Sequence, residues 1–171
     1  TTITDVLCFG NSTGALTVTP TGGTAPYSYI WTKGGSPVGT DSPTITAQSA
    51  GVYNVTVTDK FGCSVNRNLT INQPAAALTL TKESTNITCY GLNNGTASVT
   101  PSGGTSPYYY DWRDIGATPF SSNQSVTNRA PGYYTVRVSD AKGCNAEATF
   151  TLTQPAEIVI SNNPTDAVVC Q

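Results

Sequence analysis

Residues 51–63 read GVYNVTVTDKFGC, and residues 132–144 repeat the pattern as GYYTVRVSDAKGC. In the first copy Tyr53, Val55 and Val57 alternate with other residues, and a period of two predicts a half-buried β-strand. Each copy then carries a tetrad, DKFG or DAKG, with Asp first and Gly fourth. This order is typical of a tight turn in which the Asp carboxylate caps the backbone. The stretch therefore predicts a strand, a turn and a cysteine, twice over.

The offset between the two copies (132 − 51 = 81) recurs through the whole chain, and we call it the repeat interval. It separates the cysteines of two series, Cys8, Cys89 and Cys170 in one and Cys63 and Cys144 in the other. An ungapped alignment of residues 8–88 on residues 89–169 gives 26 identities in 81 positions. Nearly all fall on residues that form turns, crosslinks and cores. We therefore expect a tandem array of which this chain is a window, continuing in both directions.

Working outward from the first stretch, three more segments alternate as strands do, at residues 15–20, 26–31 and 64–71. In the last of these, Val65, Leu69 and Ile71 share one face. The triplet at residues 93–95, Asn-Asn-Gly, predicts a hairpin turn with positive φ. No segment has the period of an amphipathic helix. The fold class predicted is all-β, as tandem immunoglobulin-like antiparallel β-sandwich domains.

Two aromatic signals support that fold. Trp31 and Trp112 fall in central strands, beside tyrosines at the same parity, and we expect them in the two cores. A tyrosine also stands two residues after Gly51 and again after Gly132, as in the tyrosine corner of immunoglobulin-like sandwiches.

Proline positions predict the domain borders. Breaks at Gln73-Pro74 and Gln154-Pro155 divide the chain into a first repeat, 1–74, lacking its opening strand, a complete second repeat, 75–155, and the start of a third, 156–171. An alternative border lies in the polar stretch 81–86. In that case residues 78–80 and 158–160 form strands that complete the preceding domains.

Five regularly spaced cysteines predict disulfides and an oxidising, extracellular setting. We rank first a pairing within each repeat, Cys8 with Cys63 and Cys89 with Cys144, leaving Cys170 unpaired within the chain. A second option joins Cys63 to Cys89 and Cys144 to Cys170. A third follows from immunoglobulin-like topology, which places the first and last hairpin turns at opposite poles and so favours Cys8 with Cys144 across the junction of the domains.

Composition argues against several functions. The formal net charge is −2 and basic residues are not clustered, so nucleic-acid binding is not expected. No run approaches the roughly 18 apolar residues of a membrane span, and we expect no membrane insertion. The chain has no His, so histidine-based catalysis and histidine-liganded metal sites are excluded. We predict no enzyme activity, no cofactor and no metal site.

The combined pattern C-x-G-x-x-x-G, G-G-T-x-P-Y-x-Y-x-W, G-x-Y-x-V-x-V-x-D-x-x-G-C and Q-P resembles the SprB repeat. It runs from Cys8 to Pro74 and again from Cys89 to Pro155. That family occurs in very large surface adhesins of gliding Bacteroidetes, exported by the type IX secretion system. The resemblance implies a secreted bacterial protein attached to the outer membrane, with a repetitive, non-enzymatic role in adhesion and gliding motility. It carries over no catalytic residue.

We therefore expect a structural repeat in the stalk or fibre of an adhesin, whose partners are neighbouring repeats of the same chain. The alternative is a carbohydrate- or partner-binding module. Its candidate face, found in the second repeat only, comprises Tyr109, Arg113, Tyr133 and Arg137, and its ligands would be polysaccharides or other surface molecules.

Overall fold

The structure is a computed structural model that describes residues 1–160. Those residues form strands and connecting loops, without a helix, so the predicted all-β fold is confirmed. The first repeat contains β1 (Thr2–Thr4), β2 (Gly14–Thr17), β3 (Ser28–Lys33), β4 (Ser36–Pro37), β5 (Thr44–Gln48), β6 (Gly51–Thr58) and β7 (Ser64–Ile71). The second repeat contains β8 (Thr79–Thr85), β9 (Gly95–Ser102), β10 (Tyr108–Arg113), β11 (Pro119–Ser121), β12 (Ser125–Arg129), β13 (Gly132–Asp140) and β14 (Asn145–Leu152).

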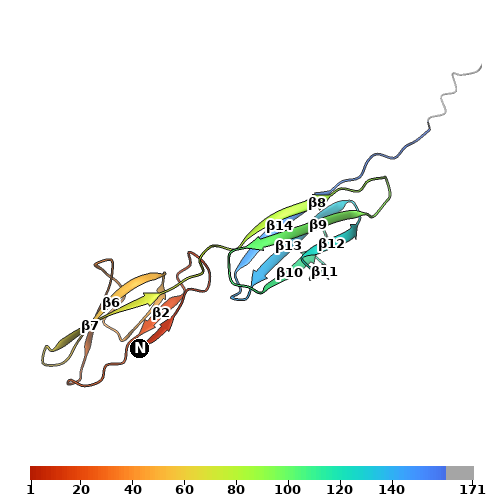
Figure 1. The fold of residues 1–171 in the computed structure, drawn as a ribbon. Helices are drawn as coiled ribbons and strands as arrows, with labels where there is room; N and C mark the ends of the chain where they lie inside the picture. The colour runs from red at the N-terminus through yellow and green to blue at the C-terminus, as the bar shows by residue number, and fades with distance from the viewer. Residues whose placement is uncertain (161–171) are drawn as a thin grey trace, which may run out of the picture. The chain divides into compact units, whose positions relative to one another are not determined.

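Each repeat is a sandwich of one three-stranded and one four-stranded sheet (Figure 1). The sheets of the first repeat have the orders β1-β2-β5 and β4-β3-β6-β7, and those of the second have β12-β9-β8 and β11-β10-β13-β14. The strand pairs at the centre of the first repeat, β3 with β6 and β6 with β7, are antiparallel. The two repeats thus have the same topology, with β8 in the place of β1.

The cores follow the repeat interval. Every buried apolar residue of the first core has a buried apolar counterpart one interval later in the second. The first set is Val6, Leu16, Val18, Trp31, Ile45, Tyr53, Val55, Val57, Leu69 and Ile71. The second is Ile87, Ala97, Val99, Trp112, Val126, Tyr134, Val136, Val138, Phe150 and Leu152. One packing scheme therefore serves both repeats.

The predicted tyrosine corners are present. The hydroxyl of Tyr53 donates to the Ser49 carbonyl over 2.7 Å, and that of Tyr134 donates to the Ala130 carbonyl over 2.9 Å. Each bond ties the start of a long central strand to the loop that precedes it. Because both rings are buried, each hydroxyl finds its partner inside the core.

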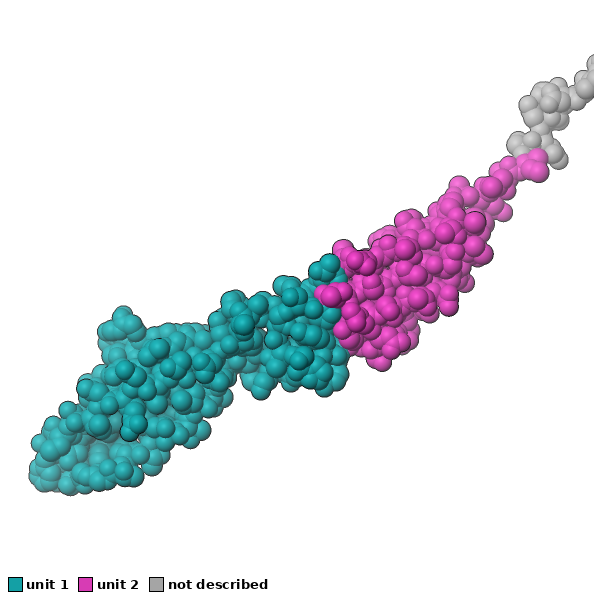
Figure 2. Space-filling view, viewed as in Figure 1, with its two compact units in different colours: residues 1–81, 101–109, 137–146 teal, residues 82–100, 110–136, 147–171 magenta. Residues whose placement is uncertain are grey.

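The chain divides into two compact units (Figure 2). Unit 1 comprises Thr1–Thr81, Pro101–Tyr109 and Arg137–Ala146, and unit 2 comprises Lys82–Thr100, Tyr110–Val136 and the residues from Glu147 on. Unit 1 thus holds the whole first repeat and, from the second, the loop before β10 and the turn between β13 and β14. That turn carries Cys144.

The opening strand predicted to be missing from the first repeat is present in shortened form. β1 has three residues and pairs with β2, whereas β8, its counterpart, has seven. Residues 158–160, the alternative closing strand of the second repeat, lie outside the strands and are exposed. Cys170 and most of the predicted third repeat lie outside the described residues.

Val65, Leu69 and Ile71 share one face of β7, as predicted, since they pair with Val57, Tyr53 and Gly51 of β6. Leu69 and Ile71 are buried, whereas the side chain of Val65 is 63% exposed. One local prediction is wrong. The Asn-Asn-Gly triplet is not a hairpin turn, because the side chain of Asn94 instead bonds the backbone N–H and the hydroxyl of Thr88, and Gly95 begins β9.

Candidate functional site

The turn between the last two long strands of each repeat fixes a cysteine through one carboxylate. In the first repeat, Asp59 Oδ1 accepts from the backbone N–H of Phe61 and of Cys63, both at 2.9 Å. Its Oδ2 accepts from the N–H of Thr24 at 3.1 Å. The backbone N–H of Asp59 in turn donates to the Cys63 carbonyl at 2.9 Å. This is the predicted Asp-first, Gly-fourth turn, and it also holds the loop before β3.

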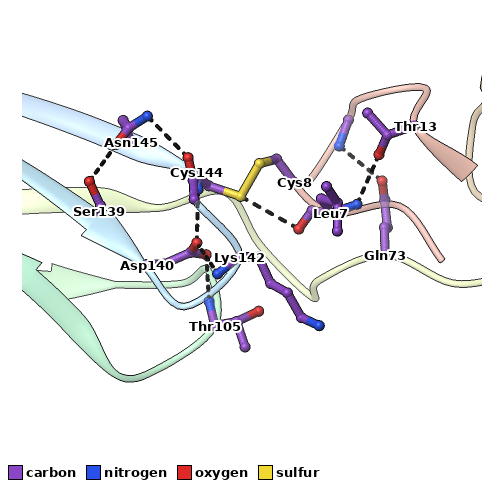
Figure 3. The surroundings of a disulfide bond; sticks show 12 residues. Leu7, Cys8, Thr13, Gln73, Thr105, Ser139, Asp140, Lys142, Cys144 and Asn145 are labelled. Carbon is purple, nitrogen blue, oxygen red and sulfur yellow. Dashed lines mark hydrogen bonds between the residues drawn. A yellow bond between two sulfur atoms is a disulfide. The ribbon is translucent and has the colours of Figure 1, made fainter. Parts of the chain in front are cut away.

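The second repeat builds the same turn (Figure 3). Asp140 Oδ1 accepts from the N–H of Lys142 and of Cys144 at 2.9 Å, and Oδ2 accepts from the N–H of Thr105 at 2.8 Å. We call Cys63 and Cys144 the turn cysteines. Their backbone positions are fixed by bonds made within their own repeats.

These hydrogen bonds set the charge state of the two carboxylates. Burial acts to raise the pKa of Asp59 and of Asp140, but four backbone N–H groups at each site together outweigh it and lower both pKa values. A carboxylate whose pKa is lower folded than unfolded stabilises the fold above the unfolded pKa, about 3.9. That contribution is lost as the pH falls through the lower, folded pKa.

We expect Asp140→Asn to destabilise the second repeat by about 1–3 kcal/mol, because the amide turns an N–H donor toward a backbone N–H and leaves that buried group without an acceptor. Asp140 is only 2% exposed. Asp59→Asn, at a more open position, is the matched control and should cost less. Urea unfolding at pH 7 and at decreasing pH measures both. The gap between wild type and Asp140→Asn should begin to narrow below about pH 4, where the carboxyl of the unfolded wild-type chain is protonated first, and should go on narrowing as the pH falls through the lower, folded pKa. Equal costs for both variants would contradict this account.

A second cysteine position lies in the loop after the opening strand. There the Gln of each Q-P break holds the loop, since Gln73 Oε1 accepts from the N–H of Gly10 at 2.9 Å and Gln154 Oε1 from the N–H of Gly91 at 3.0 Å. We call Cys8 and Cys89 the loop cysteines. Each of their carbonyls accepts from the N–H three residues on, at 3.1 and 3.2 Å.

The disulfide in the structure joins a loop cysteine to a turn cysteine of the next repeat. Cys8 is bonded to Cys144, with Cα atoms 5.6 Å apart and a sequence separation of 136 (Figure 3). Cys63 and Cys89 are free and exposed. The pairing ranked first, Cys8 with Cys63 and Cys89 with Cys144, is therefore wrong, as is a bond between Cys63 and Cys89. The third option of the sequence analysis is the one observed.

The reason is the length of β7. Cys8 follows Val6, whose N–H donates to the carbonyl of Asn72 just beyond the end of that strand, whereas Cys63 precedes its start. Eight residues in extended conformation span roughly 26 Å. A disulfide requires Cα atoms within about 7 Å of one another. The two cysteines of one repeat therefore lie at opposite poles and cannot pair.

The structure places the predicted ligand face on the outer side of the second repeat. Tyr109 is 61% exposed and Tyr133 44% exposed, and Arg113 and Arg137 are exposed as well. Arg113 is engaged by Asp111 on the same strand at 2.7 Å. In the first repeat, Ser28 is the counterpart of Tyr109 and Val52 is the counterpart of Tyr133. Ser28 pairs with Thr58 of β6, which lies six residues along the strand from Val52. By this register the two tyrosines stand at opposite ends of the strand pair.

Sequence reasoning missed a groove in the first repeat. It has a volume of about 400 Å³ and is lined by residues that include Gly22, Gly23, Asp59, Cys63 and Val65. In the second repeat the matching positions are covered, because the N–H of Gly104 donates to the Ala76 carbonyl at 3.0 Å and Gly103 lies against the Ala77 carbonyl. Thr1 also lines the groove, and β1, with three residues, is shorter than β8, with seven.

Residues 1–160 contain no group of three His, Cys, Asp or Glu side chains placed to hold a metal ion. Within the same residues there is no helix long and apolar enough to cross a membrane.

The fold and the cysteine positions define a class of protein, a tandem immunoglobulin-like repeat whose adjacent repeats are tied by a disulfide. Residues 1–36 and 81–117 match the family model of the SprB repeat. The SprB repeat model thus matches once in each repeat of the chain, and the resemblance found in the sequence is confirmed. The starts of the two matches, at residues 1 and 81, agree with the repeat interval to within one position.

Two phage proteins are also similar to this chain. The decoration protein of Escherichia phage T5 is 56% identical over 50 residues, which are 26% of this chain and 30% of that protein. The three N-terminal domains of the highly immunogenic outer capsid protein of bacteriophage RB49 match with a TM-score of 0.51 and 22% identity. That match covers 89% of this chain and 58% of the other, and it supports the immunoglobulin-like fold alone. The amphioxus IgVJ-C2 molecule matches with a TM-score of 0.40 and 14% identity over 82% of this chain and 95% of the other.

Proposed function

We propose that this chain is an extracellular structural repeat, part of the stalk or fibre of a large bacterial cell-surface adhesin involved in surface attachment and gliding motility. The observation that carries the proposal is the disulfide from Cys8 to Cys144 in a chain that matches the SprB repeat model once in each repeat. Disulfides persist outside the cytoplasm, where thiols are not kept reduced. A bond from one repeat to the next keeps successive sandwiches joined, as an extended array requires.

The repeated cores support the same proposal. In a tandem array each repeat has its own hydrophobic core, and stability is the sum of the repeats and their neighbour terms. The ten matched core pairs fit this scheme, with the surfaces between them free to differ. The proposal includes export by the type IX secretion system and attachment to the outer membrane, because the resemblance to the SprB repeat implies both.

Antibodies raised against residues 1–160 test it directly. On intact cells of the source organism, immunogold labelling should decorate the exterior without permeabilisation, and Fab fragments should reduce attachment to glass and gliding speed. Protease treatment of intact cells should remove the label. Labelling seen only after the cells are opened would refute an extracellular role.

A second candidate is a module on the surface of a virion, favoured by the 56% identity to a phage decoration protein over 50 residues. The chain spans 30% of the length of that relative. The same antibodies separate the two candidates, since purified phage particles would then carry the gold label and uninfected cells would not.

The alternative of a ligand-binding module rests on the exposed tyrosines of the second repeat. We expect the double variant Tyr109→Ser, Tyr133→Ser to change the free energy of unfolding by no more than about 0.5 kcal/mol, because both side chains lie at the surface. For a structural repeat, neither wild type nor variant should show saturable binding in a polysaccharide array or by calorimetry. Ser28→Ala with Val52→Ala, at the matched positions of the first repeat, is the control. Saturable binding that only the tyrosine variant loses would favour the module.

A further inference from the structure

Within residues 1–160, the two free cysteines stand in the same positions as the two bonded ones. Cys63 is the counterpart of Cys144, and Cys89 is the counterpart of Cys8, each at the repeat interval. One bond, from a loop cysteine to the turn cysteine of the following repeat, is present. If the same bond recurs one interval earlier, Cys63 pairs with the loop cysteine of a preceding repeat. If it recurs one interval later, Cys89 pairs with the turn cysteine of a following repeat.

The position of Cys63 is built like that of its bonded counterpart. The N–H of Cys63 and of Cys144 each donate to an Asp Oδ1 at 2.9 Å, and the carbonyl of each accepts from the N–H of that same Asp at 2.9 Å. These bonds are internal to each repeat, so a bonded neighbour is not needed to shape the turn. Cys63 is held as Cys144 is, with its thiol exposed.

The position of Cys89 matches that of Cys8 in the same way. The glutamine side chain that holds the loop bonds at 3.0 Å in the second repeat and 2.9 Å in the first. The turn bond accepted by the cysteine carbonyl measures 3.2 and 3.1 Å. The loop that presents Cys8 to its partner is therefore present again around Cys89, without a partner.

The surface around Cys63 is more open than the surface around Cys144, as expected for a turn cysteine without a bonded neighbour. Within unit 1, the loop next to Cys144 is covered by the chain that leaves the first repeat, through the contact of Gly104 with Ala76. Around Cys63 the matching surface is the open groove, where Val65 is exposed and a Cβ added at Gly22 would meet no atom within 4 Å. A repeat placed before this one would cover the groove with the segment that corresponds to residues 75–78.

Apolar side chains flank both free thiols. Phe61, two residues before Cys63, is 74% exposed, and Tyr90, next to Cys89, is 52% exposed. Tyr90 is the counterpart of Phe9, which stands next to the bonded Cys8. Beside the bonded Cys8, Phe9 is still 45% exposed, so this position stays open when the bond is made.

We propose that Cys63 and Cys89 are sites of inter-repeat disulfides, in which Cys63 bonds the loop cysteine of a repeat placed before it and Cys89 bonds the turn cysteine of a repeat placed after it. The array is then a ladder in which every junction is closed by one covalent bond. The partner is another copy of this repeat, whether the array stands on a cell or on a virion.

The bond forms by thiol–disulfide exchange with an oxidised small-molecule disulfide such as glutathione disulfide. One protein thiolate attacks that disulfide and releases the first glutathione thiolate, and the second protein thiolate then attacks the mixed disulfide and releases the second. The two protein thiols are oxidised to one disulfide, and one glutathione disulfide is reduced to two thiols, which take up the two protons.

A chain with one added repeat tests the ladder. Residues 82–162 are duplicated in frame, the original Cys170 and the copy of Cys89 in the added block are replaced by Ser, and the protein is refolded in a glutathione buffer. Non-reducing peptide mapping should find Cys8 bonded to Cys144 and Cys89 bonded to the copy of Cys144, with Cys63 alkylated as a free thiol. In the Cys89→Ser variant the copied cysteine should be free. A bond from Cys89 to Cys63 of the same chain, or a free Cys89 beside an intact bond from Cys8 to Cys144, would overturn the proposal.

A second arm needs no added repeat. In a Cys170→Ser background, the Cys63→Ser chain keeps Cys89 as its free thiol and the Cys89→Ser chain keeps Cys63. A concentrated mixture in glutathione buffer should give mixed disulfide dimers several-fold in excess of the dimers that either chain forms alone. If dimers of like chains form as readily as mixed ones, the pairing has no preference and the ladder is refuted.

Discussion

Trp112→Ala is expected to unfold the second repeat at a lower urea concentration while the first stays folded. Trp112 is fully buried, its ring centroid lies 5.3 Å from that of Phe150, and its Nε1 donates to the Asn123 carbonyl at 2.8 Å. Replacing a buried Trp by Ala costs about 3–5 kcal/mol. A single domain has a total stability of about 5–15 kcal/mol, so the loss is a large part of what holds this repeat.

The chain provides its own reporter for the outcome. It contains two tryptophans, one in each core, so Trp31 becomes the sole indole in the Trp112→Ala variant. In urea, its fluorescence should show an unchanged midpoint while circular dichroism shows an earlier step from the second repeat. Trp31→Ala is the reciprocal variant, and Trp112→Phe, which keeps most of the ring volume, should cost less. A Trp31 midpoint that falls together with the dichroism signal would mean that the two cores unfold as one.

The sequence was sufficient to predict this architecture because the features that define it are local. Alternation in residues 51–58, the Asp-to-Gly turn after them and the tyrosine two residues into β6 each depend on close neighbours along the chain, and each is present in the structure. Because the chain contains two repeats, each of these local patterns occurs twice in the sequence. The ten core pairs show that the same positions are buried in both repeats.

The disulfide could not be ranked correctly because it depends on where strands end in space. The pairing within a repeat is attractive on sequence, since it makes each repeat self-contained, but β7 separates Cys8 from Cys63 by its full length. The exposure of Val65 could not be predicted for a related reason. Its parity is right for the core, yet its exposure depends on how far the opening strand extends, which alternation in β7 does not report. The ligand face remains a prediction, since exposure alone does not identify a ligand.

The double variant Cys8→Ser, Cys144→Ser is expected to destabilise each repeat by about 4 kcal/mol in the chain-entropy model. If the second repeat unfolds alone, the crosslink closes the segment from the end of β7 at Ile71 to Cys144. If the first repeat unfolds alone, it closes the segment from Cys8 to the start of β8 at Thr79. Because these two loops are nearly equal in length, the loss should be the same whichever repeat unfolds first.

Urea unfolding of Trp31→Phe and Trp112→Phe chains, each with and without the serine substitutions, measures the two transitions separately. Cys63→Ser with Cys89→Ser is the matched control. Both thiols are free and exposed, so this variant should stay within about 0.5 kcal/mol of its parent. Adding dithiothreitol should lower the parent to the level of the Cys8→Ser, Cys144→Ser variant and leave that variant unchanged. A loss in neither transition would show that the bond constrains neither repeat. A loss in the control would show that Cys63 or Cys89 was already bonded, and either result would contradict the junction described here.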